Sequence, residues 1–268
     1  MSSDKAQKLR ALDPLVLPNV WDAGSAVLVV AAGAQAVATT SGGVAWSLGK
    51  PDGQVLTRDE MIEQVRRIAA AVDVPVTADI EGGYGPAPAD VRRTVEEVAA
   101  AGAVGVNLED SKAPGGPLFS VDEQVERIKA ARAGATAKGL HNLLINLRTD
   151  VFLFGIGPED GRLGDVLDRA KRYAEAGADG LFVPGLTDLP TIRELTAQSP
   201  LPVNVMAGPG APSVAEFIAH GVRRISLGTA IAQAAYSKAL DAAREVLDHG
   251  TYDELADILD FGQLNAKF

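Results

Sequence analysis

Short apolar runs alternate with longer amphipathic segments along most of the chain. The runs are rich in Val, Ile, Leu and Ala and do not alternate apolar with polar residues, which is typical of parallel strands buried on both faces. They predict eight strands, near residues 15–18, 36–40, 74–79, 104–108, 143–148, 180–183, 202–206 and 225–228.

The segments between these runs have the pattern of helices. In DEMIEQVRRIAAAV and PADVRRTVEEVAAAG, for example, apolar residues recur every three or four positions. Helices that alternate with strands indicate a parallel sheet. Eight such units favour a (β/α)8 barrel over a doubly wound sheet, and no G-x-G-x-x-G motif opens the first unit.

Four glycines mark places where a helix passes directly into a strand, namely Gly33, Gly102, Gly177 and Gly221. A glycine just past a helix end adopts the left-handed conformation that terminates the helix. We therefore expect a single barrel domain over residues 1–268, with 229–268 as a helical extension at its C-terminal end. That extension is either an extra helix that covers the barrel or a helix exchanged with a neighbouring subunit.

Composition narrows the class of protein. The chain has 268 residues and a formal charge of -10 at pH 7, which disfavours binding to nucleic acid. It contains no cysteine, so disulfides, thiolate ligands and thiol nucleophiles are excluded. The first residues, MSSDKAQKLRALDP, lack the apolar core of a signal peptide, and no apolar run has the length of a membrane span. We expect a soluble cytoplasmic protein that does not bind membranes.

Acidic residues gather where the predicted strands end. Asp79 and Glu81 follow one strand, Glu109 and Asp110 end the next, and Asp52 lies in a loop that precedes them. The carboxyl ends of barrel strands form the rim on which active sites are built. Carboxylates are the ligands that Mg2+ prefers, so this rim is a candidate metal site.

Six fragments together resemble the isocitrate lyase/phosphoenolpyruvate mutase superfamily: TTSGGVAW, PDG, ADIEGGYG, NLEDS, LRTDVF and PVNVMAGPG. They occur in the family's order between about Pro18 and Gly228. The resemblance implies a helix-swapped barrel that binds Mg2+, with Mn2+ as an alternative, and that makes or breaks a bond next to a 2-oxo acid through an enolate. It also implies a homodimer or homotetramer.

The resemblance assigns metal-binding roles to Asp79, Asp52 and Glu109, the last two mostly through water. Glu81 stands where relatives carry a second aspartate. Since Mg2+ keeps several waters and takes one or two carboxylates directly, such a loose shell is physically reasonable.

Substrate-binding roles are implied for three parts of the chain. Ser41, Gly42 and Gly43 resemble a turn that holds the substrate carboxylate with its hydroxyl and backbone N–H groups. Arg148 resembles an arginine that grips a carboxylate or phosphonate and balances charge on an enolate oxygen. Asn204 resembles a carboxylate-binding asparagine.

Trp46 and Tyr84 are candidates to line the same pocket, although core packing explains both equally well. Lys112, Arg148 and Glu109 are the candidate catalytic residues. Relatives that cleave isocitrate or methylisocitrate carry a cysteine in the loop after the fourth strand, whereas this chain reads SKAPGGPLFS there and resembles a subgroup of the family without that cysteine.

These features favour a Mg2+-dependent carbon–carbon lyase that acts on a small 2-oxo or 2-hydroxy acid. One alternative is a phosphonomutase or hydrolase that acts on phosphoenolpyruvate or phosphonopyruvate. Another is a barrel that binds a small dicarboxylate without turning it over.

Overall fold

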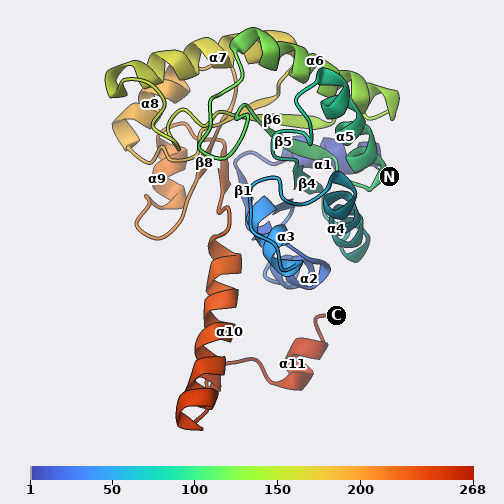
Figure 1. Cartoon of the computed structure of the whole chain (residues 1–268), viewed down its shortest axis with the longest axis vertical. Helices are drawn as coiled ribbons and strands as arrows, with labels where there is room; N and C mark the ends of the chain where they lie inside the picture. The colour runs from blue at the N-terminus through green and yellow to red at the C-terminus, as the bar shows by residue number, and fades with distance from the viewer. Residues whose placement is uncertain (1) are drawn as a thin grey trace.

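The computed structural model describes residues 2–268, and its strands form one parallel sheet that curves into a barrel (Figure 1). The strands are β1 (Leu15–Leu17), β2 (Asn19–Val20), β3 (Val37–Thr39), β4 (Val76–Asp79), β5 (Gly105–Glu109), β6 (Leu144–Arg148), β7 (Gly180–Phe182), β8 (Val203–Met206) and β9 (Arg224–Ser226). The predicted (β/α)8 barrel is confirmed.

The first predicted strand is divided in two at Pro18. β1 pairs with β9, and β2 pairs with β3, so the two pieces close the barrel between them. Proline has no N–H to give to a neighbouring strand, which explains why the ladder changes partner at this residue. The count of nine strands instead of eight has this single cause.

Helices follow the strands around the outside of the barrel. They are α2 (Ala23–Ala31), α3 (Ser41–Ser47), α4 (Arg58–Ala71), α5 (Pro88–Ala100), α6 (Val121–Ala137), α7 (Arg162–Ala176), α8 (Leu189–Gln198) and α9 (Val214–Ala219), with a 3-10 turn at Glu159–Gly161. Thr57 and Glu60 form a capping box at the start of α4, and Ser120 and Glu123 form one at α6. Residues 41–43, expected to form a turn, instead open helix α3.

All four predicted glycine joints have a positive φ angle, of +105° at Gly33 and Gly102, +104° at Gly177 and +87° at Gly221. At the amino ends of the strands, α1 (Ser2–Ala11) covers the base of the barrel. Its Leu9 packs with Leu15 and other buried apolar residues of the first strands. Apolar contacts therefore hold α1 against the base, beside a cavity of about 210 Å³ that Leu9 and Arg10 help to line.

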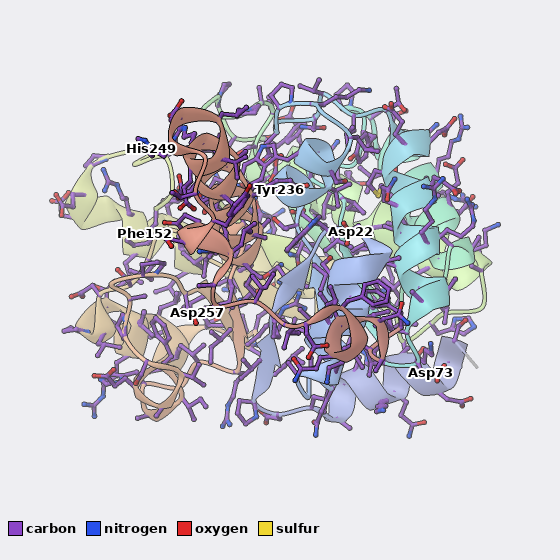
Figure 2. All side chains as sticks on the ribbon, turned by 90° about the horizontal axis from the view of Figure 1, so that it is seen from below. Asp22, Asp73, Phe152, Tyr236, His249 and Asp257 are labelled. Atoms are coloured by element: carbon purple, nitrogen blue, oxygen red, sulfur yellow. The ribbon has the colours of Figure 1, made fainter. Side chains whose placement is uncertain are left out.

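The last segment leaves the barrel. α10 (Ala230–His249) projects away from it, and the chain then turns through Asp253–Leu255 to α11 (Phe261–Asn265) (Figure 1). Figure 2 labels Tyr236 on α10, whose ring lies 6.2 Å from that of Trp21 and 6.3 Å from that of Trp46. None of the helices in residues 2–268 combines the length and apolarity that crossing a bilayer requires.

Candidate active site

A small cavity of about 180 Å³ lies at the carboxyl ends of the strands. Its wall comes from the eight strands β2 to β9 and the loops that follow them, and is formed by Asn19, Thr39, Thr40, Ser41, Asp52, Asp79, Asn107, Arg148, Leu153, Phe182, Pro184, Met206, Ser226, Gly228 and Thr229. Sites for drug-sized ligands occupy several hundred Å³, so this volume suits a ligand of few heavy atoms.

Asp79 is the half-buried carboxylate of this wall. Its Oδ2 accepts a hydrogen bond from the Ser41 backbone N–H at 3.2 Å, and its Oδ1 accepts one from the Glu81 N–H at 3.2 Å. Its own N–H donates to Thr39 Oγ1. Burial raises the pKa of Asp79, and the charge of Arg148 offsets part of that rise.

Glu81 stands behind Asp79 in the loop after β4. Its Oε1 accepts from the Tyr84 hydroxyl at 3.0 Å, and its Oε2 accepts from the Gln54 backbone N–H at 2.5 Å. Burial, together with the negative charge of Asp79, raises the pKa of Glu81 to about 7. Glu81, Tyr84 and Gln54 all have positive φ angles, an uncommon conformation for residues with side chains that clusters at functional sites.

Arg148 brings positive charge to the cavity, and two carboxylates hold it in place. Its guanidinium contacts Glu109 Oε2 at 2.9 Å and Asp150 Oδ1 at 2.6 Å. Asp150 is fixed in turn by the Ser111 hydroxyl at 2.6 Å. Burial raises the pKa of Glu109 to about 8, although the charge of Arg148 opposes that rise. Arg148 therefore enters the cavity in a fixed orientation.

A second buried cluster supports this one from outside the barrel. Asp110 accepts hydrogen bonds from the Asp150 backbone N–H, the Arg169 guanidinium and the Tyr173 hydroxyl. Burial raises the pKa of Asp110 to about 6, against the charge of Arg169. The cluster ties the ends of β5 and β6 to helix α7, so it stabilises the backbone that carries Glu109 and Arg148.

The glycines after Ser41 allow close packing. A Cβ atom on Gly42 would lie 2.8 Å from Thr229 Cγ2 and 3.0 Å from Asp52 Oδ2, and one on Gly43 would lie 2.8 Å from Trp21 Cβ. Both positions therefore favour glycine. Their role here is to bring helix α3 against the cavity wall.

Of the predicted site residues, Ser41, Asp52, Asp79 and Arg148 form part of the cavity wall. Gly42, Gly43, Glu81 and Glu109 adjoin it through the contacts above, and four others lie further from it. Asn204 is completely buried beneath it. Trp46 faces α10. Tyr84 is turned to Glu81. Lys112 lies beside a separate, larger cavity of about 640 Å³, where it contacts Glu123 at 3.3 Å and the Phe119 ring. Their predicted roles in binding and catalysis remain predictions.

The cavity fits a hydrated divalent cation better than a metal held by protein alone. Nowhere in residues 2–268 do three or more carboxylate or imidazole side chains converge as a metal cage. Asp52 and Asp79 both reach the wall, however, and the positive charge of Arg148 lowers the pKa of Asp79 against the larger effect of burial. Mg2+ takes one or two carboxylates and keeps its remaining waters, so this donor set suits it.

Several residues of the site escape prediction from the sequence. No sequence motif marks Asn19, Ser226 or Thr229, because ordinary loops and strand ends carry the same residue types. Asn107 does give a signal, since a polar residue interrupts an otherwise apolar buried strand in VGVNLED. Asp150, two residues after Arg148 in the same LRTD fragment, orients its guanidinium through the 2.6 Å contact.

The barrel with a carboxylate–arginine rim defines an α/β barrel of the phosphoenolpyruvate mutase type. The family model for phosphoenolpyruvate phosphomutase matches residues 6–247, and the chain belongs to this family. Within it, the chain is 31% identical to 2-methylisocitrate lyase of Salmonella typhimurium over 92% of its length and 85% of the relative. It is 36% identical to oxaloacetate decarboxylase of a Bradyrhizobium strain, over 75% and 69% of the two chains.

Solved structures agree with this placement. A phosphonomutase-like protein of Burkholderia cenocepacia superposes with a TM-score of 0.84 at 44% identity, over 94% of this chain and 100% of the other. A phosphonopyruvate hydrolase bound to oxalate and Mg2+ has the same fold, with a TM-score of 0.84 at 21% identity over 100% and 95% of the chains. The protein is thus similar to enzymes, some of them lyases and some phosphonomutases.

Proposed function

We propose that this protein is a Mg2+-dependent carbon–carbon lyase that cleaves a small 2-oxo or 2-hydroxy acid through an enolate. The observation that carries the proposal is the pairing of a fixed arginine with buried carboxylates around a cavity of about 180 Å³. The small volume favours small substrates. The similarity to 2-methylisocitrate lyase and oxaloacetate decarboxylase supports chemistry next to a carboxylate.

Each side chain has a part in this proposal. Asp79, Asp52, Glu81 and Glu109 are the residues that would hold the cation. The bound cation supplies Lewis-acid polarisation of the substrate oxygens. Arg148 grips the substrate and balances the charge that develops as the C–C bond breaks, because its orientation is set beforehand by Glu109 and Asp150.

Ligand binding tests the site before a substrate is known. Oxalate is a planar dianion that resembles the enolate of pyruvate, so we expect Mg2+ and oxalate together to raise the melting temperature by several degrees. A ligand at 100 times its Kd adds about 2.7 kcal/mol to the free energy of unfolding. Each kcal/mol raises the melting temperature of a domain of this size by roughly 2–4 °C. A folded protein that does not respond to the pair, compared with either alone and with EDTA, would contradict the proposal.

Arg148 allows a sharper test on whichever acid a substrate screen identifies. Arg148→Ala should lower kcat by about 100-fold or more, as loss of a charge-stabilising donor does in other enzymes. Since this variant leaves Glu109 and Asp150 buried without a partner, Arg148→Lys is measured beside it, and both are checked for folding by circular dichroism. Arg172→Ala on the surface is the control and should keep full activity. Unchanged turnover in folded Arg148→Ala would refute the assigned role.

Phosphonate chemistry is the second candidate function. The family model and the 44% identity to the Burkholderia protein favour it. Phosphorus NMR of the protein with Mg2+ and phosphonopyruvate or phosphoenolpyruvate separates the two candidates. A P–C rearrangement or hydrolysis gives new phosphorus signals, whereas a carbon–carbon lyase leaves the spectrum unchanged. Binding of oxalate without turnover of any acid would instead favour the non-catalytic dicarboxylate-binding barrel.

We also propose that the protein is a homo-oligomer in which the C-terminal extension packs on a second copy. Leu247 on α10 is 84% exposed, and Phe261 on α11 is 85% exposed. Apolar side chains this exposed on a projecting helix are typical of a protein interface.

A further inference from the structure

The barrel interior directly beneath the cavity is polar. Asn107 on β5, Asn146 on β6, Asn204 on β8 and Arg224 on β9 are all buried, with exposed fractions of 7%, 1%, 0% and 5%. The inside of such a barrel is usually filled by branched apolar residues. A layer of amides around an arginine at this position therefore needs an explanation.

Arg224 is the unusual member of this layer. It makes no ion pair with any carboxylate in residues 2–268, and its Nε and Nη1 atoms are buried without a hydrogen-bond partner. Its Nη2 donates to Asn107 Oδ1 at 3.0 Å. Burial lowers the pKa of Arg224 to about 9. Because an unpaired buried charge destabilises a fold, a role in stability does not explain this arginine.

The hydrogen bonds within this layer fix which side-chain atom of each asparagine donates and which accepts. Asn204 Nδ2 donates to the backbone carbonyl oxygens of Val205 and Arg224, which can only accept. Asn204 Oδ1 therefore faces Asn146, whose Nδ2 donates to it at 2.9 Å and also donates to Asn107 Oδ1 at 2.9 Å. An arginine can only donate, so Arg224 independently requires the same Oδ1 of Asn107 to point toward it.

The amide nitrogen of Asn107 is consequently presented to the cavity. Its Oδ1 accepts from Arg224 and Asn146, its Nδ2 donates to no atom of residues 2–268, and the residue lines the cavity beside Asp79, with which it is in register. We propose that Asn107 is a ligand-binding residue that donates this N–H to an anionic oxygen of a planar 2-oxo acid or its enolate, and that Arg224 is its positioning residue. The inference rests on the proposed function and adds to it a donor that faces the ligand from below.

Substitutions at Asn107 test the donor, with oxalate affinity in the presence of Mg2+ measured by calorimetry. Asn107→Ala removes the N–H and should weaken oxalate binding by about tenfold to a hundredfold, as loss of a hydrogen bond to a charged group does. Asn107→Asp keeps the size of the side chain and an acceptor for Arg224, but turns an acceptor toward the anion, so it should weaken binding further. Asn142→Asp is the same change on the surface and should bind like wild type. Oxalate affinities within about twofold of wild type in both Asn107 variants would overturn the proposal.

Substitutions at Arg224 separate positioning from structural support. Arg224→Met removes a buried charge, so the melting temperature without ligand should stay the same or rise. Oxalate binding should weaken by about tenfold, because Asn107 Oδ1 then keeps the hydrogen bond from Asn146 but loses the one from Arg224, and the amide flips more readily. Arg224→Lys keeps a donor toward Asn107 and should recover most of the affinity. Arg223→Met, at the exposed neighbouring arginine, is the control.

Two results would overturn the positioning role. One is an Arg224→Met variant that binds oxalate like wild type. The other is a variant that loses stability and affinity together, since that indicates structural support alone. Failure of the wild-type protein to bind oxalate with Mg2+ would contradict the proposed function itself, and this outcome is distinguished from failure of the inference because the wild type is measured first.

Discussion

At the scale of single residues, the rim carries more negative charge than its arginine balances. Glu81 and Glu109 are both buried near other carboxylates, and the pKa values of about 7 and about 8 express the cost of ionising them there. Each of these carboxyl groups would ionise more readily beside a divalent cation. The same arrangement that weakens the free protein at high pH thus favours binding of a cation.

This cost predicts a pH dependence of stability in the protein without metal. The folded pKa values of Glu81 and Glu109 lie above the ordinary value of 4.5, so the native state binds more protons than the unfolded state between about pH 4.5 and 8. The stabilisation that comes from protonated Glu81 and Glu109 is fully present below about pH 4.5 and is lost as the pH rises through about 7 to 8. Melting curves in EDTA from pH 5 to 8.5 should show the fall, and Mg2+ should stabilise more at pH 8 than at pH 5.

The Glu81→Gln variant is the comparison for this prediction, because its amide does not ionise. The advantage of the variant in melting temperature over wild type should increase with pH across the window. A difference between the two proteins that stays constant from pH 5 to 8.5 would contradict the assignment of the effect to Glu81.

At the scale of secondary-structure elements, helices α5 and α6 pack so closely that one glycine is required. A Cβ atom on Gly134 of α6 would lie 2.6 Å from the backbone oxygen of Arg92 on α5. Replacing a glycine by alanine inside a helix normally stabilises it by about 1 kcal/mol. Here the backbone oxygen cannot turn aside as a flexible side chain can, so Gly134→Ala should lower the free energy of unfolding.

Gly164 on α7 provides the matched control. It is also inside a helix, but a Cβ atom there meets nothing within 4 Å. Gly164→Ala should therefore stabilise the protein by about 0.5–1 kcal/mol, measured by urea unfolding. If both alanine variants shift stability in the same direction, the close approach of α5 and α6 is not the deciding factor.

The elements themselves could be predicted because their signals are local. Apolar runs and glycine joints each depend on a few neighbouring residues, and they located every strand to within about two residues. The division of the first strand at Pro18 could not be predicted, because it depends on which strand lies on each side. The same limit applies to the site: Asp79 and Arg148 were found through motifs, whereas Arg224 acquires its place beneath the cavity from the closed barrel alone.

At the scale of the whole molecule, the C-terminal extension is the part that the barrel does not account for. The barrel closes without it, and α10 meets the rest of the molecule near its start, where Ala232 is buried and Tyr236 lies beside Trp21 and Trp46 (Figure 2). Beyond that contact the extension exposes a series of large apolar side chains: Leu240, Leu247, Tyr252, Ile258, Leu259, Phe261 and Phe268. In a monomer these side chains would remain in water at a cost in free energy.

The proposed assembly can be tested by removing the apolar character of the extension. Multi-angle light scattering should give the wild type a mass of two or four times 27.8 kDa, and Leu247→Asp combined with Phe261→Asp should shift it toward the single-chain mass. Val214→Asp, the same kind of change on α9, should keep the wild-type mass. Because Thr229 at the start of α10 lines the cavity, loss of the partner should also loosen that wall and weaken oxalate binding. A wild type that is monomeric at micromolar concentration would refute the assembly while leaving the residues of the cavity as they are.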